Sequence, residues 1–487
     1  MRALPSLPSS PGQAAVWRRA AAVDVRAITA DSREVRPGYL FAALPGTRVD
    51  GRRFIADAVE RGAAAILAPE GTAWPAGTPP RPLWEDPEPR RRLAQIAAML
   101  AGSQPAVSVA VTGTNGKTST VEFLRQIWAQ SGRAAASLGT LGLNAPGFAA
   151  GSGLTTPDPV ALANMLAELA RAGVQCIAME ASSHGLDQFR LDGVRVGAAA
   201  FTNLTRDHLD YHGTLEAYRD AKLRLFAELL PEGAPAIAST ALDADSLAAL
   251  RAIVLRRRQR LLTVGEGGAA IALRRATPVT DGQILELESC GTKREIHLPL
   301  AGRFQADNAL VAAALAKATG THGALDLLGG LAGVRGRMEL AARLPNGAAV
   351  YVDYAHTPDA LDRLLSALRP HTEGRLHVVF GAGGDRDRGK RPLMGDVAAR
   401  LADRAIVTDD NPRSENPATI RAAILGACPG ALEIGDRAAA IAAGLNDLGP
   451  GDVLVVAGKG HEQGQTVGKT VLPFDDVQTV RGLAGLA

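Results

Sequence analysis

The sequence AVSVAVTGTNGKTS, residues 106–119, decides the fold of the central part of the chain. Its apolar first half predicts a short buried strand, and its glycine-rich second half leads into a helical pattern that stops near Gly132. A glycine-rich loop between a strand and a helix is typical of phosphate binding, because backbone N–H groups, the helix N-terminus and a lysine surround the phosphate oxygens. The residues that we expect to bind ATP here are Gly113, Thr114, Asn115, Gly116, Lys117, Thr118 and Ser119.

This loop is a variant, because Val111 occupies the position of the first glycine in the usual phosphate-loop pattern. The alternative is a chance glycine-rich turn. The strand before the loop and the helix after it favour phosphate binding.

Strands and helices alternate on both sides of this loop. Apolar segments at 175–180, 197–204 and 234–240 alternate with helical patterns, which predicts a parallel sheet with helices on both faces. Residues 268–300 alternate in polarity around two turns and predict antiparallel strands. Further strands at 348–354, 376–384, 404–410 and 452–460 predict another α/β unit. Two helices are expected between 300 and Gly333.

We therefore predict an α/β protein of three domains, at 1–103, 104–335 and 336–487. The first is a small α/β domain, the second a parallel-sheet phosphate-loop ATPase with a small antiparallel insert, and the third a Rossmann-like domain. The length of 487 residues agrees with about three domains, because single hydrophobic cores stop growing near ~250–300 residues.

Composition excludes several classes of protein. The formal net charge of +3, from 53 basic and 50 acidic residues, is too balanced for a nucleic-acid binder. No apolar stretch approaches the ~18–20 residues of a membrane span, and the proline-broken N-terminus does not resemble a signal peptide. Cys176, Cys290 and Cys428 are too few for a disulfide framework or a zinc site. We expect a cytoplasmic monomer that binds small molecules and neither nucleic acid nor membrane.

Two polar segments follow predicted strands and suit a divalent cation. Glu180 ends one strand, and Asp207, His208 and Asp210 follow another. Mg²⁺ takes few protein ligands and shares itself with nucleotide phosphates. The alternative is that the two aspartates cap a helix and that the histidine is bonded locally. Lys222, in a helical pattern nearby, is unremarkable by its position alone.

Lysine is rare in this chain, since only seven of the 53 basic residues are lysines. Three of the seven lie inside glycine- or polar-rich motifs: Lys117, Lys390 and Lys459. Arginine supplies the ordinary surface charge, so these lysines are candidates for chemistry that a guanidinium cannot perform.

The segments TGTNGKTS, MEASSHGL, FTNLTRDHLDYHGT, GRMEL, VDYAHTPDAL and GAGGDRDRGKRP resemble, in this order and spacing, the motifs of the Mur ligases. The resemblance extends to DSREVRPGYLFAALPG near the N-terminus and so spans nearly the whole chain. It implies an N-terminal domain for the UDP end of the substrate, a central ATPase and a C-terminal domain for an amino acid. ATP would phosphorylate a carboxylate, and an amine would attack the acyl phosphate to form an amide.

The resemblance also implies roles for individual residues. Lys117, Glu180, His208 and Lys222 would be catalytic, with Thr118, Glu180, His208 and a carbamate on Lys222 holding two Mg²⁺ ions. Further nucleotide contacts would come from Asn308, Arg337 and Asp353. Contacts to a UDP-muramoyl-dipeptide, UDP-N-acetylmuramoyl-L-alanyl-D-glutamate, would come from Ala30, Ser32, Thr155, Thr156, Ser182, Gln188 and Arg190.

The segment Asp410-Asn411-Pro412-Arg413 resembles that of the members which add meso-diaminopimelate. A guanidinium can meet the far carboxylate of diaminopimelate with two hydrogen bonds, whereas it would repel the ammonium of lysine. The positions implied for this amino acid are Arg386, Asp410, Asn411, Pro412, Arg413, Gly458 and Glu462.

Two departures from the family pattern concern nucleotide contacts. Gln305 stands where the family usually has Asn, and residues 47–49 differ from the triplet of well-known members. The competing interpretations are a lysine-adding ligase, a folylpolyglutamate synthase, a phosphate-loop ATPase without an amino-acid acceptor, and a member that binds without reacting.

Overall fold

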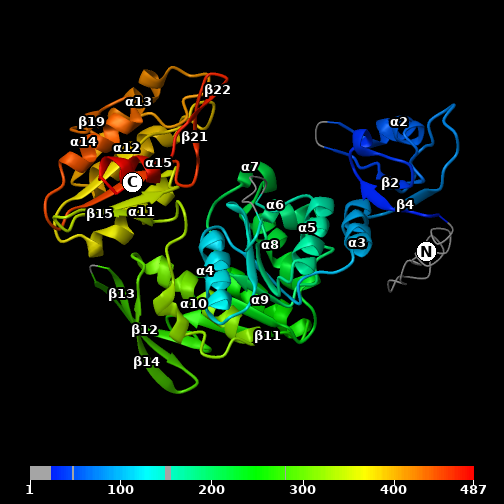
Figure 1. The fold of residues 1–487 in the computed structure, drawn as a ribbon, viewed down its shortest axis with the longest axis horizontal. Helices are drawn as coiled ribbons and strands as arrows, with labels where there is room; N and C mark the ends of the chain where they lie inside the picture. Colours follow the sequence, from blue (N-terminus) through cyan, green and yellow to red (C-terminus); the bar gives the residue numbers. More distant parts are fainter. Residues whose placement is uncertain (1–22, 47–48, 149–154, 280, 487) are drawn as a thin grey trace. The chain divides into compact units, whose positions relative to one another are not determined.

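The computed structural model describes residues 23–46, 49–148, 155–279 and 281–486. The chain forms two compact units. Unit 1 consists of Met1–Thr263 and Ala314–His322, and unit 2 consists of Val264–Ala313 and Gly323–Ala487. Figure 1 follows the chain by colour from the N-terminus to the C-terminus. The domain boundaries expected near 103 and 335 do not coincide with the ends of these units, and they stay predictions.

Unit 1 begins with a parallel sheet of four strands in the order β1-β2-β3-β4. The strands are β1 (Ala27–Thr29), β2 (Tyr39–Ala42), β3 (Ala65–Pro69) and β4 (Leu83–Asp86). Helix α3 (Pro89–Ala101) buries one apolar stripe against one face of this sheet, and α2 (Ile55–Glu60) contributes to a separate apolar cluster with Phe41 and Ile66. Two 3₁₀-helices, η1 (Ser32–Glu34) and η2 (Gly51–Phe54), connect the elements.

The second sheet of unit 1 contains the strand predicted at 106–112. It includes, in this order, β10-β9-β5-β8-β6-β7, which are parallel except for the β6–β7 pair. The strands are β5 (Val107–Thr112), β6 (Ala135–Gly139), β7 (Gly142–Asn144), β8 (Cys176–Glu180), β9 (Ala198–Phe201) and β10 (Pro235–Ser239). Strands β8, β9 and β10 are fully buried, which explains their continuous apolar sequences.

Helices cover this sheet, as predicted. They are α4 (Lys117–Gln130), α5 (Pro159–Arg171), α6 (Ser183–Asp187), α7 (Leu209–His212), α8 (Leu215–Arg224) and α9 (Ala244–Arg256). Helix α5 begins where Asp158 accepts hydrogen bonds from the Val160 and Ala161 N–H groups. Helix α8 changes at Leu225 into the π-helix η3 (Leu225–Leu229).

The boundary between the units falls inside β11 (Arg260–Gly265). Strands β12 (Ile271–Val279), β13 (Gly282–Ser289) and β14 (Thr292–Leu298) are antiparallel, which confirms the predicted insert. Helix α10 (Arg303–Ala318) follows, but the second expected helix is only a 3₁₀-helix, η4 (Asp326–Gly330). Its sequence contains Gly329 and Gly330, which disfavour a longer α-helix.

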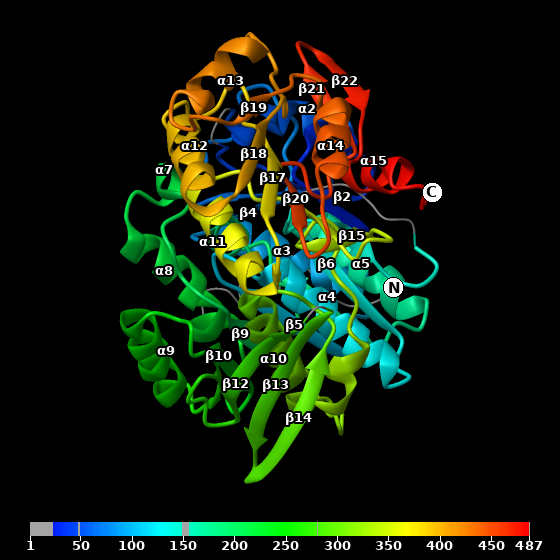
Figure 2. The same ribbon diagram turned by 90° about the vertical axis from the view of Figure 1, so that its left-hand side faces the viewer.

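Unit 2 contains a six-stranded sheet in the order β15-β16-β20-β17-β18-β19, parallel except for the β15–β16 pair. The strands are β15 (Glu339–Arg343), β16 (Ala349–Asp353), β17 (Leu376–Phe380), β18 (Arg404–Val407), β19 (Leu432–Glu433) and β20 (Val453–Ala457). One face buries α11 (Pro358–Leu368), α12 (Lys390–Leu401) and α13 (Pro417–Leu425), and the other buries α14 (Arg437–Asn446) and α15 (Asp476–Leu483). Figure 2 shows α11 and α12 on one side of β17, β18 and β20, and α14 and α15 on the other.

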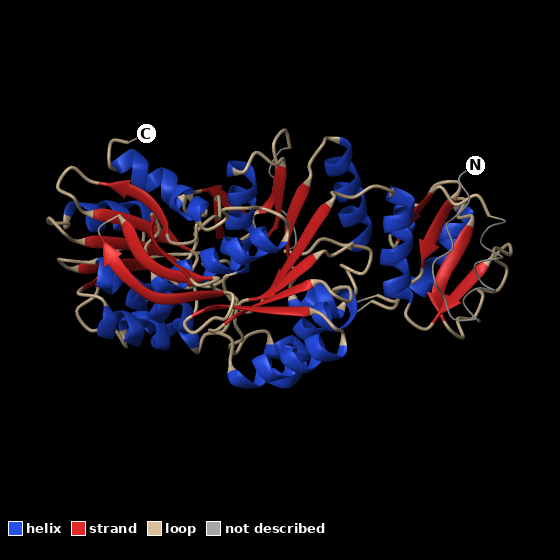
Figure 3. Ribbon diagram, turned by 90° about the horizontal axis from the view of Figure 1, so that it is seen from below, coloured by secondary structure: helices blue, strands red, loops and turns tan. Residues whose placement is uncertain are grey.

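The 3₁₀-helix η5 (Arg369–His371) and the hairpin β21 (Gly464–Val467)–β22 (Thr470–Pro473) complete unit 2. Figure 3 shows the strands in red with helices in blue beside them. Polar loops follow the carboxyl ends of the neighbouring strands β8, β5 and β9, and of β16, β20, β17 and β18. In open α/β sheets ligands bind at these ends. Among the described residues, no helix is both long and apolar enough to span a membrane.

Candidate functional site

The predicted phosphate loop lies between β5 and the first turn of α4. Lys117 is the first residue of α4, and Gly116 precedes it with a left-handed φ of 83°. The Lys117 ammonium donates to the carbonyls of Gly113 and Thr114, at 2.9 and 2.8 Å. The loop therefore presents backbone N–H groups at a helix N-terminus with a lysine folded over them, which suits phosphate oxygens. Thr118 and Ser119 are buried in the same turn.

The loop is fixed by the segment that follows β9. The Asn203 carbonyl accepts from the Thr114 N–H at 2.9 Å, and the Asn203 side chain accepts from the Asn115 N–H at 2.9 Å. Gly113 has a φ of 144°, and a Cβ atom there would collide with the Thr202 hydroxyl. Only glycine fits this position, because the backbone of the loop passes so close to β9.

Lys222 lies on α8 and is 1% exposed. Its amine donates to the Gly113 carbonyl at 2.7 Å and lies 4.3 Å from the centre of the Tyr218 ring. Burial lowers the pKa of Lys222 well below its ordinary value, and the nearby Lys117 charge lowers the pKa further. The structure thus places a buried primary amine, whose pKa is lowered, directly against the phosphate loop.

Glu180 ends β8, the neighbour of β5, and is 2% exposed. Its carboxylate accepts from the Thr140 N–H at 2.8 Å and from the Thr140 hydroxyl at 3.3 Å. Among the described residues no Lys, Arg or His forms an ion pair with it. A buried carboxylate without a cationic partner is costly, so this one fits a metal ion as its missing counter-charge.

His208 has a left-handed backbone, with a φ of 52°, and lies in a cluster of rings with His184, Tyr211 and Tyr218. Its Nε2 atom lies 3.5 Å from the Asp207 carboxylate. The histidine therefore also has a local partner, as the alternative to a metal site expected. In the ranges that the structure describes, no three His, Cys, Asp or Glu side chains gather as a metal site.

Five of the residues expected at the muramoyl-dipeptide lie together at the carboxyl end of β8. The hydroxyls of Thr156 and Ser182 are 3.0 Å apart, and the hydroxyl of Thr155 is 3.2 Å from that of Thr140. Arg190 donates to the Thr156 carbonyl and to the Gln188 side chain, at 2.7 Å each.

The Arg190 guanidinium is half-buried, and burial lowers its pKa. No described carboxylate forms an ion pair with it, which leaves it suited to a substrate carboxylate.

The other two members of this set lie in the N-terminal sheet region. Ala30 is exposed, and Ser32 is buried in the 3₁₀-helix η1 after Asp31. In the part of the chain that the structure describes, no hydrogen bond joins either one to the other five. Of the triplet at 47–49, residues 47 and 48 lie outside the described residues, and Val49 is exposed.

Unit 2 holds the remaining residues expected at the nucleotide. Asn308 is buried and donates to the Gln305 side chain at 3.4 Å, and Gln305 in turn donates to the Arg337 carbonyl at 3.1 Å. Asp353 accepts from the N–H groups of Met338 and Ala355, at 2.6 and 2.7 Å, while burial raises its pKa. Gln305, which departs from the family pattern, therefore links Asn308 to Arg337, two residues that are expected to bind the nucleotide.

Three of the residues expected to bind diaminopimelate, Asp410, Asn411 and Glu462, lie around the buried Lys459 ammonium. It donates to the Asn411 side chain at 3.0 Å and to Glu462 at 3.3 Å, and it lies 3.7 Å from Asp410. The Asn411 amide also donates to Glu462 at 2.9 Å. Gly458 lies next to Asp410, since a Cβ atom there would be 3.0 Å from its carboxylate.

Arg413 has a left-handed backbone, with a φ of 52°. The hairpin holds it, because its N–H donates to Thr466 at 3.0 Å and its carbonyl accepts from Gly468 at 2.7 Å. Its guanidinium donates to the Gly384 carbonyl at 2.8 Å, and no described carboxylate forms an ion pair with it. Pro412 precedes it in the same loop.

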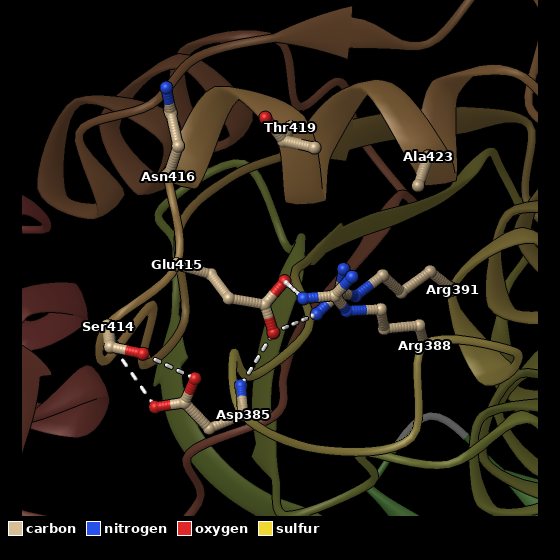
Figure 4. A pocket seen from close by; sticks show the side chains of 8 residues that line it. All are labelled: Asp385, Arg388, Arg391, Ser414, Glu415, Asn416, Thr419 and Ala423. Atoms are coloured by element: carbon tan, nitrogen blue, oxygen red, sulfur yellow. Dashed lines mark hydrogen bonds and ion pairs between the residues drawn. The ribbon is translucent and has the colours of Figure 1, made fainter.

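Arg386 is exposed, and its one hydrogen bond to a described residue is to the Asp385 carbonyl of its own loop, at 3.5 Å. Next to this loop lies a cavity of about 590 Å³, which Figure 4 shows. In it Arg388 and Arg391 both point toward Glu415, at 3.3 and 2.9 Å, and Ser414 points toward Asp385. These bonds join the loop of Arg386 to the loop of Arg413. The two positive charges of Arg388 and Arg391 are balanced by the two negative charges of Glu415 and Asp385.

Sequence reasoning missed several residues of these sites. Tyr218, Thr140, Asn203 and Lys459 contact predicted site residues, and none was assigned a role. The scarcity of lysine did point to Lys459. Thr140 carried no signal, because a threonine after a glycine is ordinary in any turn.

Comparison with known proteins finds three family models along this chain. "Mur ligase family, catalytic domain" matches residues 24–101, "Mur ligase middle domain" matches 111–316, and "Mur ligase, glutamate ligase domain" matches 336–460. Their succession agrees with the predicted order of three α/β domains.

Known proteins are similar over nearly the full chain. A UDP-N-acetylmuramoyl-L-alanyl-D-glutamate--2,6-diaminopimelate ligase from Caulobacter vibrioides is 55% identical, over 95% of this chain and 96% of that protein. One of the same name from Rhizobium meliloti is 54% identical, over 96% and 95%.

Solved structures are similar as well. A structure of a UDP-N-acetylmuramoyl-L-alanyl-D-glutamate--2,6-diaminopimelate ligase superposes with a TM-score of 0.72 at 34% identity, over 94% of each chain. A MurF ligase from Thermotoga maritima in complex with ADP has a TM-score of 0.61 at 20% identity, over 96% of this chain and 98% of that one, which shows the fold alone.

Proposed function

This chain belongs to the Mur ligase family, and we propose that it joins meso-2,6-diaminopimelate to the D-glutamate of UDP-N-acetylmuramoyl-L-alanyl-D-glutamate at the expense of ATP. The product is a precursor of peptidoglycan. The relatives from Caulobacter and Rhizobium carry this activity in their names and align with nearly all of this chain. The residues of both units suit the same reaction.

The reaction begins on a carboxylate, which is a poor acyl donor. Its oxygen attacks the γ-phosphorus of ATP, and ADP leaves. The amine of diaminopimelate then attacks the acyl carbon, and phosphate leaves with the original carboxylate oxygen while the amine loses a proton. The protein mainly orients the reactants and offsets crowded negative charge.

The phosphate loop supplies much of the positive charge that offsets the negative charge of the phosphates. We assign the γ-phosphate to Lys117, whose ammonium lies over the loop carbonyls, and the other phosphates to the loop N–H groups and the α4 N-terminus. Asn308, Arg337 and Asp353 are assigned to the remainder of the nucleotide.

Thr118, Glu180 and His208 are the proposed protein ligands of Mg²⁺, with a carbamate on Lys222 as a further ligand and two ions in all. When bound, Mg²⁺ polarises phosphoryl oxygens and screens their charge. The burial of Lys222 supports the carbamate, because only a neutral amine reacts with CO₂ and burial lowers the pKa of this amine. The carbamate would place an anion there that a metal ion can balance.

Substrate carboxylates match two arginines that form no ion pair with a carboxylate among the described residues. Arg190, with Gln188, Thr155, Thr156 and Ser182, would hold the muramoyl-dipeptide, and Ala30 and Ser32 would contact its uridine end. Arg413 would meet the far carboxylate of diaminopimelate, and Glu462 with Asn411 would meet the neighbouring ammonium. Arg386, Asp410, Pro412 and Gly458 complete this proposed set.

The proposal that diaminopimelate is the amino acid added rests on the contacts of Arg413. The hairpin holds the Arg413 backbone, and its guanidinium bonds to the Gly384 carbonyl and pairs with no described carboxylate, so it favours an incoming carboxylate over the ammonium of lysine. We propose a cytoplasmic monomer that uses small-molecule substrates alone.

An isotope experiment tests the acyl-phosphate route. The dipeptide substrate would carry ¹⁸O in its reacting carboxylate, and the released phosphate would be analysed by mass spectrometry. We expect one labelled oxygen in each phosphate released during ligation. Unlabelled phosphate would mean that water attacks ATP, which would favour the ATPase interpretation.

A further inference from the structure

A buried group of charges lies behind the proposed muramoyl-dipeptide site. We call it the Asp192 cluster, and it consists of Asp192, Arg224, Arg91 and Glu228. The Asp192 side chain is 1% exposed and the Arg224 side chain 11%. None of these residues has a part in the reaction as proposed above.

Arg224 is the centre of the cluster. Its two terminal nitrogens donate to the two carboxylate oxygens of Asp192, one of them at 2.9 Å. It also lies 3.0 Å from Glu228 on the next turn. Arg91, on α3, lies 3.1 Å from Asp192 and braces the same carboxylate. A planar fork that meets a carboxylate with two hydrogen bonds fixes orientation as well as distance.

The same guanidinium holds the turn that carries two proposed substrate ligands. It donates to the Leu186 carbonyl at 2.8 Å and stacks on the Phe189 ring at 4.3 Å. Phe189 lies between Gln188 and Arg190 and has a left-handed φ of 59°. A bulky residue keeps such a backbone only where its surroundings enforce it. Arg224 holds the turn at the Leu186 carbonyl and the Phe189 ring, and the Asp192 N–H donates to the Phe189 carbonyl at 3.3 Å.

Arg224 also lies on the helix of Lys222. The two residues are separated by one position near the C-terminal end of α8, where the chain changes to the π-helix η3. Helix interruptions of this kind often occur where a side chain must be placed precisely for function. One side chain thus connects the turn of Gln188 and Arg190 to the helix that carries Lys222.

We propose that Arg224, held by Asp192, is a positioning residue for the UDP-muramoyl-dipeptide. It fixes the left-handed turn at Phe189, and through that turn it directs Gln188 and Arg190 toward the substrate. This inference rests on the proposed function, since it assumes that these two residues bind the muramoyl-dipeptide.

Steady-state kinetics of the full chain with Arg224→Lys test the proposal. Lysine keeps the charge but loses the two-point bond and the stacking on Phe189. We expect the KM for the UDP-muramoyl-dipeptide to rise about tenfold or more, while the KM for ATP changes less than about twofold. In an Arg190→Ala background the same change should raise that KM by a smaller factor, because one of the two residues through which Arg224 acts is already gone.

Arg92→Lys is the matched control. Arg92 pairs with Asp86 at 2.7 Å, and both side chains are similarly buried, at 12% and 11% exposure, but the pair does not contact the turn. Its KM values should equal those of the wild type. Should Arg224→Lys not yield soluble protein, Asp192→Asn receives the same assay, with a smaller increase in the same KM expected.

An unchanged KM for the dipeptide, or an equal rise in every KM, would overturn the proposal. So would full additivity with Arg190→Ala. Failure of the proposed function is a separate result, because the wild-type protein would then form no diaminopimelate-dependent product.

Discussion

Gly139→Ala should displace the Glu180 side chain and so disable the proposed metal site, although no metal ligand is itself substituted. Gly139 ends β6 and is buried beside the end of β8. A Cβ atom there would lie 2.5 Å from both Cγ and Cδ of Glu180, and nearer still to Oε1. The backbone of Gly139 does not have a positive φ, so alanine itself is conformationally acceptable.

The size of the effect follows from these distances. Carbon atoms in contact are about 3.5–4.0 Å apart, so the Glu180 carboxylate must move by about 1 Å or more. Overpacking of this kind costs about 1–3 kcal/mol of stability. A misplacement of about 1 Å at a reacting centre lowers the rate by about 100-fold, or about 2.7 kcal/mol of transition-state stabilisation.

The assay is ligation at varied Mg²⁺ concentration, together with thermal unfolding. We expect Gly139→Ala to lower kcat/KM by about 100-fold and to require more Mg²⁺. Gly197→Ala is the control, because its Cβ atom would meet only the Ser108 carbonyl, at 3.6 Å. Gly139→Ala/Glu180→Asp removes one methylene from the crowded side chain, so it should regain thermal stability but not activity.

Wild-type kinetics and Mg²⁺ dependence in Gly139→Ala would refute the role assigned to Glu180. A loss of activity in the Gly197→Ala control would show instead that the strand ends tolerate no change at all.

Three further results are expected. Lys222→Arg should abolish ligation, and wild-type activity should fall when CO₂ and bicarbonate are removed. The control Lys293→Arg, at an exposed site, should behave as the wild type. An active Lys222→Arg protein would rule out the carbamate. Arg413→Ala should raise the KM for diaminopimelate by about 100-fold, at about 1.4 kcal/mol per factor of ten, and leave the KM for ATP unchanged. An unchanged KM for diaminopimelate would contradict the proposal that Arg413 selects this amino acid. Burial, with Arg337 and Arg335 nearby, lowers the pKa of His461 from 6.5 to about 4. Between these values the unfolded chain binds a proton that the folded chain does not, so the thermal midpoint should fall as the pH falls through this window. His461→Gln should reduce that fall, and an equal fall in both proteins would show that other groups cause it.

The fold was predictable where local signals agreed. The strand, loop and helix around Gly113 carry apolar, glycine and helical patterns in succession, and the structure has all three. The antiparallel strands of 271–298 were equally clear because they alternate around turns. The hairpin β21–β22 was missed, since Gly464–Pro473 is polar, exposed and short. Its role becomes visible only through its bonds to Arg413.

The site was less accessible to sequence reasoning, because burial and long-range contacts define it. Lys222 occupies an ordinary helical position, and only the structure shows that it is buried beneath the phosphate loop, 109 positions from Gly113. The departure at Gln305 raised a question about the nucleotide, and its bond to the Arg337 carbonyl gives a structural answer. The π-helix after Arg224 has no sequence signature that separates it from a continuing α-helix.

Acceptor-dependent phosphate release tests the central claim most directly. The protein would be incubated with ATP, Mg²⁺ and UDP-N-acetylmuramoyl-L-alanyl-D-glutamate, with either meso-diaminopimelate or L-lysine added. We predict release that depends on diaminopimelate, together with a product heavier by that residue. Release that depends on lysine, or that needs no acceptor, would contradict the account.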